Sequence, residues 1–354
     1  MNAPAPLAVS VRSADLADRR DAARIDAFVA AHPEGTIFHR PQWSRAVERG
    51  CGQKAHYLVA ERGGTLVGGL PLTEIRSRLF GHALVSAGFA TGGGILAENE
   101  AVAARLAEAG WAMAEQTSCA SLELRGAVLP RGWTRREGVY ANFARDLPAG
   151  AEPLLASIPR RQRAEIRRAL RFGLELSRGT DRRHRDAHYR VYAESVRNLG
   201  TPVFPRSLFD AALDEFGDSA WIILVAREGR PLAAMLGFDH KGTCQPYWGG
   251  GTAEARRWRA NDLVYFETMR AGIEHGCTRT DFGRSKVGGG AWARKRIWGF
   301  EETPLVYASR TADGSTAREI NPLNPKYRAR ISVWRKLPLP LANRLGPFLS
   351  RGLG

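Results

Sequence analysis

The chain has 354 residues, of which 44% are hydrophobic, and this length is sufficient for two domains or one large domain with a buried core. No apolar run approaches the roughly 18 residues of a membrane-spanning helix, and the N-terminus has no basic and apolar stretch typical of a secretion signal. Four widely spaced cysteines without a CxxC pair favour reduced thiols in a cytoplasm and argue against structural zinc.

The net charge is +16, and only six of the 52 basic residues are lysines. Residues 160–190 hold eleven arginines against four acidic residues. Such a concentration favours an anionic partner, such as a phosphate group, RNA or a membrane surface, although a solvated helix face would look the same. The candidate patch for an anionic partner consists of Arg160, Arg161, Arg163, Arg167 and Arg168.

The first half of the chain predicts helices alternating with short strands. After a flexible lead, the expected elements are helices over 14–31 and 39–49, a hairpin over 56–60 and 65–73, a strand over 84–89, a helix from Asn99 and a strand over 121–124.

The second half repeats this order. Residues 58–72 align with residues 224–238 at an offset of 166, and the triple glycines at 92–94 and 249–251 differ by 157, as do Gly126 and Gly283. We therefore expect two copies of one mixed unit, each with a hairpin, a strand, a helix and a parallel strand.

This pattern predicts an α/β (α+β) fold with two tandem domains, each a mixed sheet flanked by helices. We expect an N-terminal domain over 1–148, a C-terminal domain over 149–312 and a tail over 313–354. Only the second copy keeps polar residues at the end of its last strand. The first copy is therefore expected to bind and the second to carry the chemistry.

The most informative stretch is 243–300. A strand over 243–248 is expected to break at the triple glycine, and a helix opens at Asn261-Asp262 and closes at His275-Gly276. A parallel strand over 278–282 should follow it. Ligands gather beyond the carboxyl ends of such strands. The residues expected there are Tyr247, Trp248 and Gly249 from the first strand, Asp281, Arg284, Ser285 and Lys286 from the second, and Lys295 from a short helix nearby.

Several familiar catalytic templates do not fit. His184 and His188 have the i, i+4 spacing of a zinc-protease helix but lack its glutamate, so a surface helix is expected there. Gly283 begins no nucleophile elbow, and the glycines at 288–290 begin no Walker loop. No metal site is expected. The basic, amphipathic tail could touch a membrane surface, but a strap docked on the protein is the favoured interpretation.

Several phrases resemble the FemAB family, in the branch associated with exosortase/PEP-CTERM systems. They are FGHALVSAGFATGGGIL, ESVRNLGTPVFP, YWGGGTAEARRWRANDLVYFETMR, CTRTDFGRSKVGGG, WGFE and NPLNPKYR. The resemblance implies two GNAT-like acyltransferase domains facing across a cleft. The best-known members transfer amino acids from aminoacyl-tRNA to a cell-wall peptide precursor, and this branch is associated with exopolysaccharide and PEP-CTERM export.

The family pattern usually has Phe-Lys before Trp-Gly-Phe, whereas this chain has Arg294-Lys295. The resemblance implies that the lysine stabilises the oxyanion and contacts the donor, although a solvated helix face would also explain Lys295. GNAT enzymes hold the CoA pyrophosphate with a glycine-rich loop before the central helix. Residues 256–261 have no glycine there, and the bulky Trp258 would obstruct such a loop, so a CoA donor is disfavoured.

The resulting hypothesis is an acyl or aminoacyl transferase that forms an amide on an amine of a cell-envelope glycan or peptide precursor. Lys295 and the backbone at Gly249 would stabilise the oxyanion, and Asp281 would take the amine proton unless it is a structural carboxylate. The residues expected to bind substrate are Tyr247, Trp248, Arg284, Ser285, Lys286, Asn261 and Asp262. Of these, Tyr247 and Trp248 could equally be core residues, and Asn261 and Asp262 could be helix caps.

No permanently bound cofactor is expected. The acyl donor is a co-substrate, either aminoacyl-tRNA or an acyl-CoA or acyl-carrier protein, and DNA is not an expected partner. The expected location is cytoplasmic, with possible peripheral contact at the inner membrane through the tail. The alternatives are a CoA- or carrier-protein-dependent N-acyltransferase and a non-catalytic basic module that binds RNA or an export complex.

Overall fold

The computed structural model describes residues 7–126, 128–312 and 325–354. Within the last range, the side chains are described only from residue 331 onward. The chain divides into two compact units. Unit 1 runs through Glu137 and also takes in the chain from Val306 and the last residues, Arg351–Gly354; unit 2 comprises Gly138–Leu305 and the tail up to Ser350. The predicted boundary lies after residue 148, whereas these two units divide between Glu137 and Gly138, within strand β7 (Thr134–Asp146).

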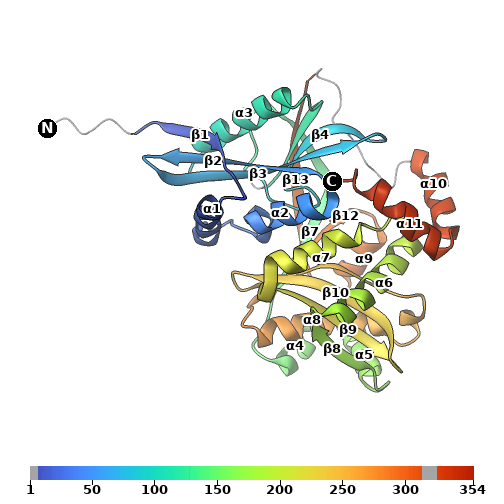
Figure 1. The fold of residues 1–354 in the computed structure, drawn as a ribbon. Helices are drawn as coiled ribbons and strands as arrows, with labels where there is room; N and C mark the ends of the chain where they lie inside the picture. The colour runs from blue at the N-terminus through green and yellow to red at the C-terminus, as the bar shows by residue number, and fades with distance from the viewer. Residues whose placement is uncertain (1–6, 127, 313–324) are drawn as a thin grey trace. The chain divides into compact units, whose positions relative to one another are not determined.

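Unit 1 is a mixed sheet with helices on both faces (Figure 1). Its elements are β1 (Val9–Ser13), α1 (Arg19–Ala31), α2 (Pro41–Cys51), β2 (Lys54–Arg62), β3 (Thr65–Ser77), β4 (Gly81–Ser86), β5 (Leu96–Ala97), α3 (Glu100–Gln116), β6 (Ser121–Arg125) and the end of β13 (Glu301–Thr311). The strand order is β1-β2-β3-β4-β6-β13, with β5 beside β3.

Alternation along β2 explains the two layers of unit 1. Leu58 and Ala60 belong to the core under α3, whereas Tyr57 and Val59 pack with α1 on the other face. Helix α3 begins as the sequence predicts, because the side chain of Asn99 accepts a hydrogen bond from the backbone N–H of Val102 at 3.0 Å.

Unit 2 has the same design with more helices. Its elements are β7 (Thr134–Asp146), α4 (Ala151–Ser157), α5 (Arg160–Leu170), β8 (Glu175–Gly179), α6 (Arg182–Leu199), α7 (Arg206–Phe216), β9 (Ala220–Arg227), β10 (Arg230–His240), β11 (Thr243–Gly251), α8 (Ala260–Glu274), β12 (Arg279–Lys286), α9 (Gly290–Arg296), α10 (Pro325–Lys336) and α11 (Leu339–Ser350). The strand order is β7-β12-β11-β10-β9-β8.

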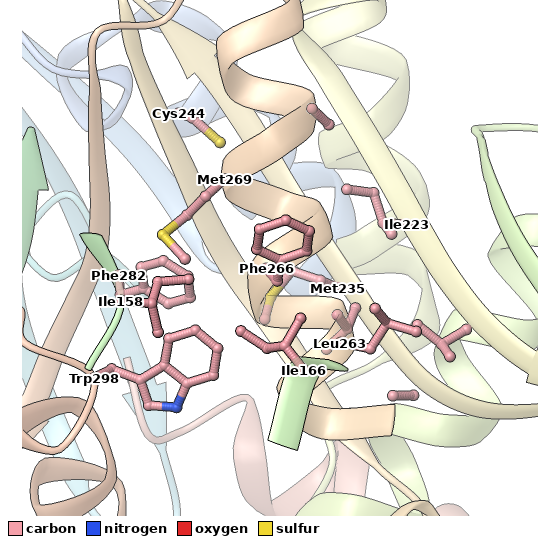
Figure 2. Packing of buried hydrophobic residues seen from close by; sticks show 14 of the residues in the cluster. Ile158, Ile166, Ile223, Met235, Cys244, Leu263, Phe266, Met269, Phe282 and Trp298 are labelled. Carbon is pink, nitrogen blue, oxygen red and sulfur yellow. The ribbon is translucent and has the colours of Figure 1, made fainter. Parts of the chain in front are cut away.

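The core of unit 2 lies between the sheet and α8. Leu263, Phe266 and Met269 point from α8 into one cluster with Ile223 of β9 and Met235 of β10 (Figure 2). The helical spacing of the three α8 residues is the one the sequence predicts. The loop residue after α9, Trp298, is fully buried in the same cluster and therefore fixes α9 against the sheet.

The predicted duplication is confirmed. Each unit has a hairpin (β2-β3 or β9-β10), a strand (β4 or β11), a helix (α3 or α8) and a strand that pairs in parallel with the one before the helix (β6 or β12). The parallel pairing covers two residue pairs in each unit. A strand over β1 was not predicted, because it lies within the stretch interpreted as a flexible lead.

Three local predictions are wrong. The triple glycine does not break β11, since Gly249–Gly251 continue its antiparallel pairing with β10. Strand β12 continues past Phe282 to Lys286 through a register shift after Asp281. His184 and His188 lie on the buried face of α6, where they are 8% and 1% exposed, so their helix is not simply a surface helix.

Part of the tail docks on unit 2 as a strap. Helix α11 buries Ala342, Gly346 and Ser350, and the Ser350 hydroxyl donates a hydrogen bond to the Val203 carbonyl at 2.9 Å. The motif that starts at residue 321 begins outside the described residues. None of the helices in the described part of the chain combines the length and apolar character needed to span a bilayer.

Candidate functional site

The site predicted from the sequence lies where β11 and β12 part. The two strands pair in parallel only at Thr243 with Arg279 and at Cys244 with Thr280. Each strand has its antiparallel neighbour on its other edge: β12 pairs with β7 from Arg279 to Lys286, and β11 pairs with β10. The later part of β11, which contains Gly249, is therefore no longer paired with β12 on this edge.

Strand alternation gives the direction of the backbone at Gly249. The N–H of Thr252 donates to the carbonyl of Leu232 at 2.9 Å, so this pair of residues is of the hydrogen-bonded kind. Because such pairs alternate along an antiparallel ladder, the N–H of Gly250 also faces β10 and that of Gly249 faces the opposite edge. The N–H of Gly249 thus faces the edge of β11 on which β12 pairs at Thr243 and Cys244.

The glycine run itself has a packing reason. A Cβ on Gly249 would lie 2.3 Å from Met235 Sδ, and one on Gly250 would lie 2.2 Å from Ser195 Oγ. A Cβ on Gly251 would lie 2.2 Å from Asn261 Oδ1. The glycines therefore let side chains of unit 2 close against the strand from both faces.

A bulge in β12 holds the candidate acid–base group. Asp281 Oδ1 accepts hydrogen bonds from the N–H of Gly283 at 2.7 Å and from Asn142 Nδ2 of β7 at 3.0 Å. Gly283 has a φ of +67°, a conformation that favours glycine and that turns the strand at the bulge. Burial raises the pKa of Asp281, against the opposing effects of its two hydrogen bonds and of Lys295 and Arg279.

Lys295 holds the same bulge from its carbonyl side. The Lys295 side chain is 7% exposed, and its ammonium donates hydrogen bonds to the carbonyls of Phe282, Gly283 at 3.0 Å and Arg284 at 3.4 Å. The interpretation of Lys295 as part of a solvated helix face is therefore wrong. Burial lowers the pKa of Lys295 to about 8, although the nearby Asp281 acts in the opposite direction.

This arrangement places a proton acceptor and a cation on one bulge. A carboxylate with a raised pKa can take a proton from an attacking ammonium or amine. An ammonium has three donors, and each of those of Lys295 meets a carbonyl of β12. Lys295 therefore sets the position of the bulge directly, and it would stabilise an oxyanion through its charge or by releasing one carbonyl.

The end of β12 presents its residues to two faces. Arg284 and Lys286 lie on the same face of the sheet as Tyr140. The Arg284 guanidinium is 4.7 Å and the Lys286 ammonium 6.0 Å from the centre of the Tyr140 ring. Ser285 alternates to the other face, where its buried Oγ has no hydrogen-bond partner among the described residues. These three residues therefore do not form a single binding surface.

Tyr247 and Trp248 contribute to an aromatic cluster beneath α6 and α7. The Trp248 ring is 4% exposed, and its centre lies 5.0 Å from that of Phe209. The Trp248 carbonyl accepts a hydrogen bond from His188 Nε2 at 2.8 Å. Trp248 thus has the surroundings of a core residue, whereas Tyr247 is half-buried at the edge of the same cluster.

Asn261 and Asp262 lie in the first turn of α8 and do not cap it. The N-cap is Arg259, whose φ is +58° and whose carbonyl accepts from the N–H of Asp262 at 3.0 Å. Asp262 accepts a hydrogen bond from Arg294 Nη2 at 2.9 Å. Arg294, which stands where the family pattern has an aromatic residue, thus gains a carboxylate partner, and burial raises the pKa of Asp262.

The arginine-rich segment forms α5, which packs against α8. Ile166 of α5 and Leu263 of α8 share one core cluster, and Glu165 of α5 pairs with Arg259 at 2.6 Å. Arg160, Arg161, Arg167 and Arg168 are exposed and Arg163 is half-buried. The arginine patch therefore borders the turn that leads into α8.

Two residues of the site were not predicted. Asn142, which holds Asp281, and Tyr140, which lies under Arg284, both come from β7. This strand lies outside the repeated pattern, and Asn142 is 139 residues from its partner in sequence. No local signal could have found it. Among the described residues, no group of three or more His, Cys, Asp and Glu side chains is arranged to hold a metal ion.

Comparison with known proteins places this architecture in the GNAT fold. Residues 160–294 match the family model described as an acetyltransferase (GNAT) domain. No curated protein matches the chain.

Solved structures extend the likeness over most of the chain. The crystal structure of FemX is similar at a TM-score of 0.65 and 16% identity, covering 84% of this chain and 96% of that one. A tandem GNAT protein from the clavulanic acid biosynthesis pathway gives 0.58 and 12%, covering 87% and 100%. The structure of L-PGS from Bacillus licheniformis gives 0.55 and 14%, covering 88% and 96%. The chain therefore has a tandem GNAT fold.

Proposed function

We propose that this chain is an acyl or aminoacyl transferase that forms an amide on an amine acceptor of a cell-envelope glycan or peptide precursor. The observation that carries the proposal is the bulge of β12 beside the end of β11, where Asp281 accepts from the Gly283 N–H and Lys295 donates to the Gly283 carbonyl. The GNAT fold and the likeness to FemX agree with acyl transfer. The link to exopolysaccharide and PEP-CTERM export rests on the resemblance in sequence alone.

In the proposed reaction, the electron pair of the acceptor amine forms the new C–N bond, and the amine loses one proton. The amine nitrogen of the acceptor attacks the carbonyl carbon of the activated ester, and the carbonyl oxygen takes up the negative charge. The Gly249 N–H and the charge of Lys295 stabilise this oxyanion. Asp281 accepts the amine proton. The oxyanion electron pair then re-forms the C=O bond while the C–O or C–S bond to the donor breaks, and the departing alcohol or thiol takes the proton from Asp281.

The surroundings of α8 favour a large anionic donor over CoA. The turn before α8 contains Trp258. The centre of its ring lies 3.5 Å from the guanidinium carbon of Arg227, and the ring packs edge-on against Phe172. This turn has no glycine that would allow close approach of a pyrophosphate. The exposed arginines of α5 lie next to it, and a polyanion such as aminoacyl-tRNA matches such a surface.

Donor binding tests this part of the proposal. Fluorescence anisotropy with labelled tRNA should give saturable binding, and Arg167→Glu together with Arg168→Glu should weaken it by tenfold or more and lower the salt dependence. Arg182→Glu, a reversal at a 94% exposed arginine side chain of α6, is the matched control and should change the affinity less. Saturable binding of acyl-CoA with no tRNA binding would instead establish the CoA-dependent alternative.

The non-catalytic alternative predicts a different outcome. If the chain only docks RNA or an export complex, reversal of the α5 arginines would abolish its biological activity while Asp281→Asn would leave it intact. The transferase proposal predicts that each of these changes lowers activity, since one affects donor binding and the other affects proton transfer.

A further inference from the structure

Helix α11 carries large apolar side chains on the face that points away from the protein. Leu341, Leu345 and Phe348 are 43%, 42% and 74% exposed. Their spacing of four and three residues places them on one stripe of the helix. An exposed stripe of this kind is uncommon in a globular protein unless another surface covers it.

The opposite face of α11 shows that the helix is already docked. Ala342, Gly346 and Ser350 are buried, and a Cβ on Gly346 would lie 2.9 Å from the Val203 side chain. The residues that face the protein are therefore small, and the residues that face outward are large and apolar. This is the reverse of an ordinary amphipathic surface helix, whose large apolar residues face the core.

The neighbouring elements extend the apolar surface. Val333 of α10 is 63% exposed, and so is Leu199 at the end of α6. Leu199 is close to α10, since its carbonyl accepts a hydrogen bond from Arg335 Nη2 at 3.2 Å. Outward-facing apolar residues thus occur on three adjoining elements of unit 2.

The charge of this region indicates what covers it. Residues 325–354 contain seven lysines and arginines and no acidic residue. Lys336 of α10 and Arg344 of α11 are exposed, and these two helices also carry Val333 and the apolar stripe. Apolar side chains flanked by cations, with no carboxylate between them, are complementary to the headgroup boundary of an anionic bilayer, whereas a protein partner imposes no such bias.

We infer that α10 and α11 dock the protein onto an anionic phospholipid surface, with Leu341, Leu345 and Phe348 inserted at the headgroup boundary. The inference is independent of the transferase proposal, because it concerns binding without substrate. It assigns the outer face of the tail a role in addition to the strap contact made by its inner face.

Vesicle flotation with the full-length protein tests the inference. The protein should float with vesicles of phosphatidylcholine and phosphatidylglycerol and bind vesicles of phosphatidylcholine alone at least tenfold more weakly. Leu345→Glu with Phe348→Glu should lower partitioning at least tenfold. Leu79→Glu, at a 67% exposed leucine of unit 1, is the matched control and should bind as the wild type does.

A second pair of variants separates charge from apolar contact. Lys336→Glu with Arg344→Glu should lower binding to anionic vesicles about tenfold or more and leave binding to neutral vesicles unchanged. Because these four tail positions are exposed, thermal unfolding should match that of the wild type. Failure of the wild type to float with anionic vesicles would overturn the inference. So would floating of the Leu345→Glu, Phe348→Glu variant as well as the wild type, or a wild-type dimer that this variant converts to a monomer.

Discussion

Replacing Lys295 with methionine tests whether its ammonium is buried against the carbonyls of β12. Its folded pKa of about 8 lies below the usual 10.5, so the unfolded chain binds more protons between these values. Stability should therefore rise with pH in this range, because the penalty for burying the charge disappears as Lys295 loses its proton. The full shift corresponds to about 3 kcal/mol, of which about 2 kcal/mol should appear between pH 7 and pH 9.5.

The assay is urea unfolding of the wild type and Lys295→Met at several pH values. Other groups titrate in both proteins, so the informative quantity is the difference between their free energies of unfolding. This difference should grow in favour of the wild type by about 2 kcal/mol from pH 7 to pH 9.5. The offset at pH 7 combines two opposing effects, removal of a buried charge and loss of a donor to three carbonyls. A difference that does not change with pH would refute the burial of a charged Lys295.

Three further changes probe other parts of the molecule. Asp281→Asn should keep the fold, since its amide oxygen can still accept from Asn142, yet lower transfer about 100-fold or more; Asp218→Asn, at an exposed position, is the control. Burial lowers the pKa of His188 to about 4, so the wild type should lose about 2 kcal/mol more stability than a His188→Asn variant as the pH falls from 6.5 to 4.5, and equal losses would contradict the burial of a neutral His188. Trp298→Ala should destabilise unit 2 by ~3–5 kcal/mol in urea unfolding, and a loss under 1 kcal/mol would argue against its place in the core.

The duplicated fold could be predicted because its spacing survives in the sequence. The offset of 166 superposes the β2-β3 hairpin on β9-β10, and that of 157 superposes the α3-β6 segment on α8-β12. Apolar periodicity and turn glycines are local signals, and they identify elements well. The same reasoning gave the position of Asp281 on the later parallel strand and of Lys295 on the short helix that follows it.

The errors arose where tertiary contacts override local signals. Three glycines in a row indicate a break, yet Met235, Ser195 and Asn261 close on them, and β11 continues its pairing with β10 as far as Gly251. Lys295 lies among arginines, and this is why an exposed helix face stood as the alternative to a catalytic role. Its burial depends instead on Trp298, which anchors the end of α9 in the core. No local pattern records either contact.

Transfer of a labelled acyl group measures the central claim most directly. The full-length protein is incubated with labelled aminoacyl-tRNA, or with labelled acyl-CoA, and an extract of cell-envelope glycan and peptide precursors, and products are identified by mass spectrometry. The account predicts an amide-linked product that depends on the wild-type protein and falls about 100-fold or more with Asp281→Asn. No amide product with either donor, or equal yields from the wild type and Asp281→Asn, would contradict it.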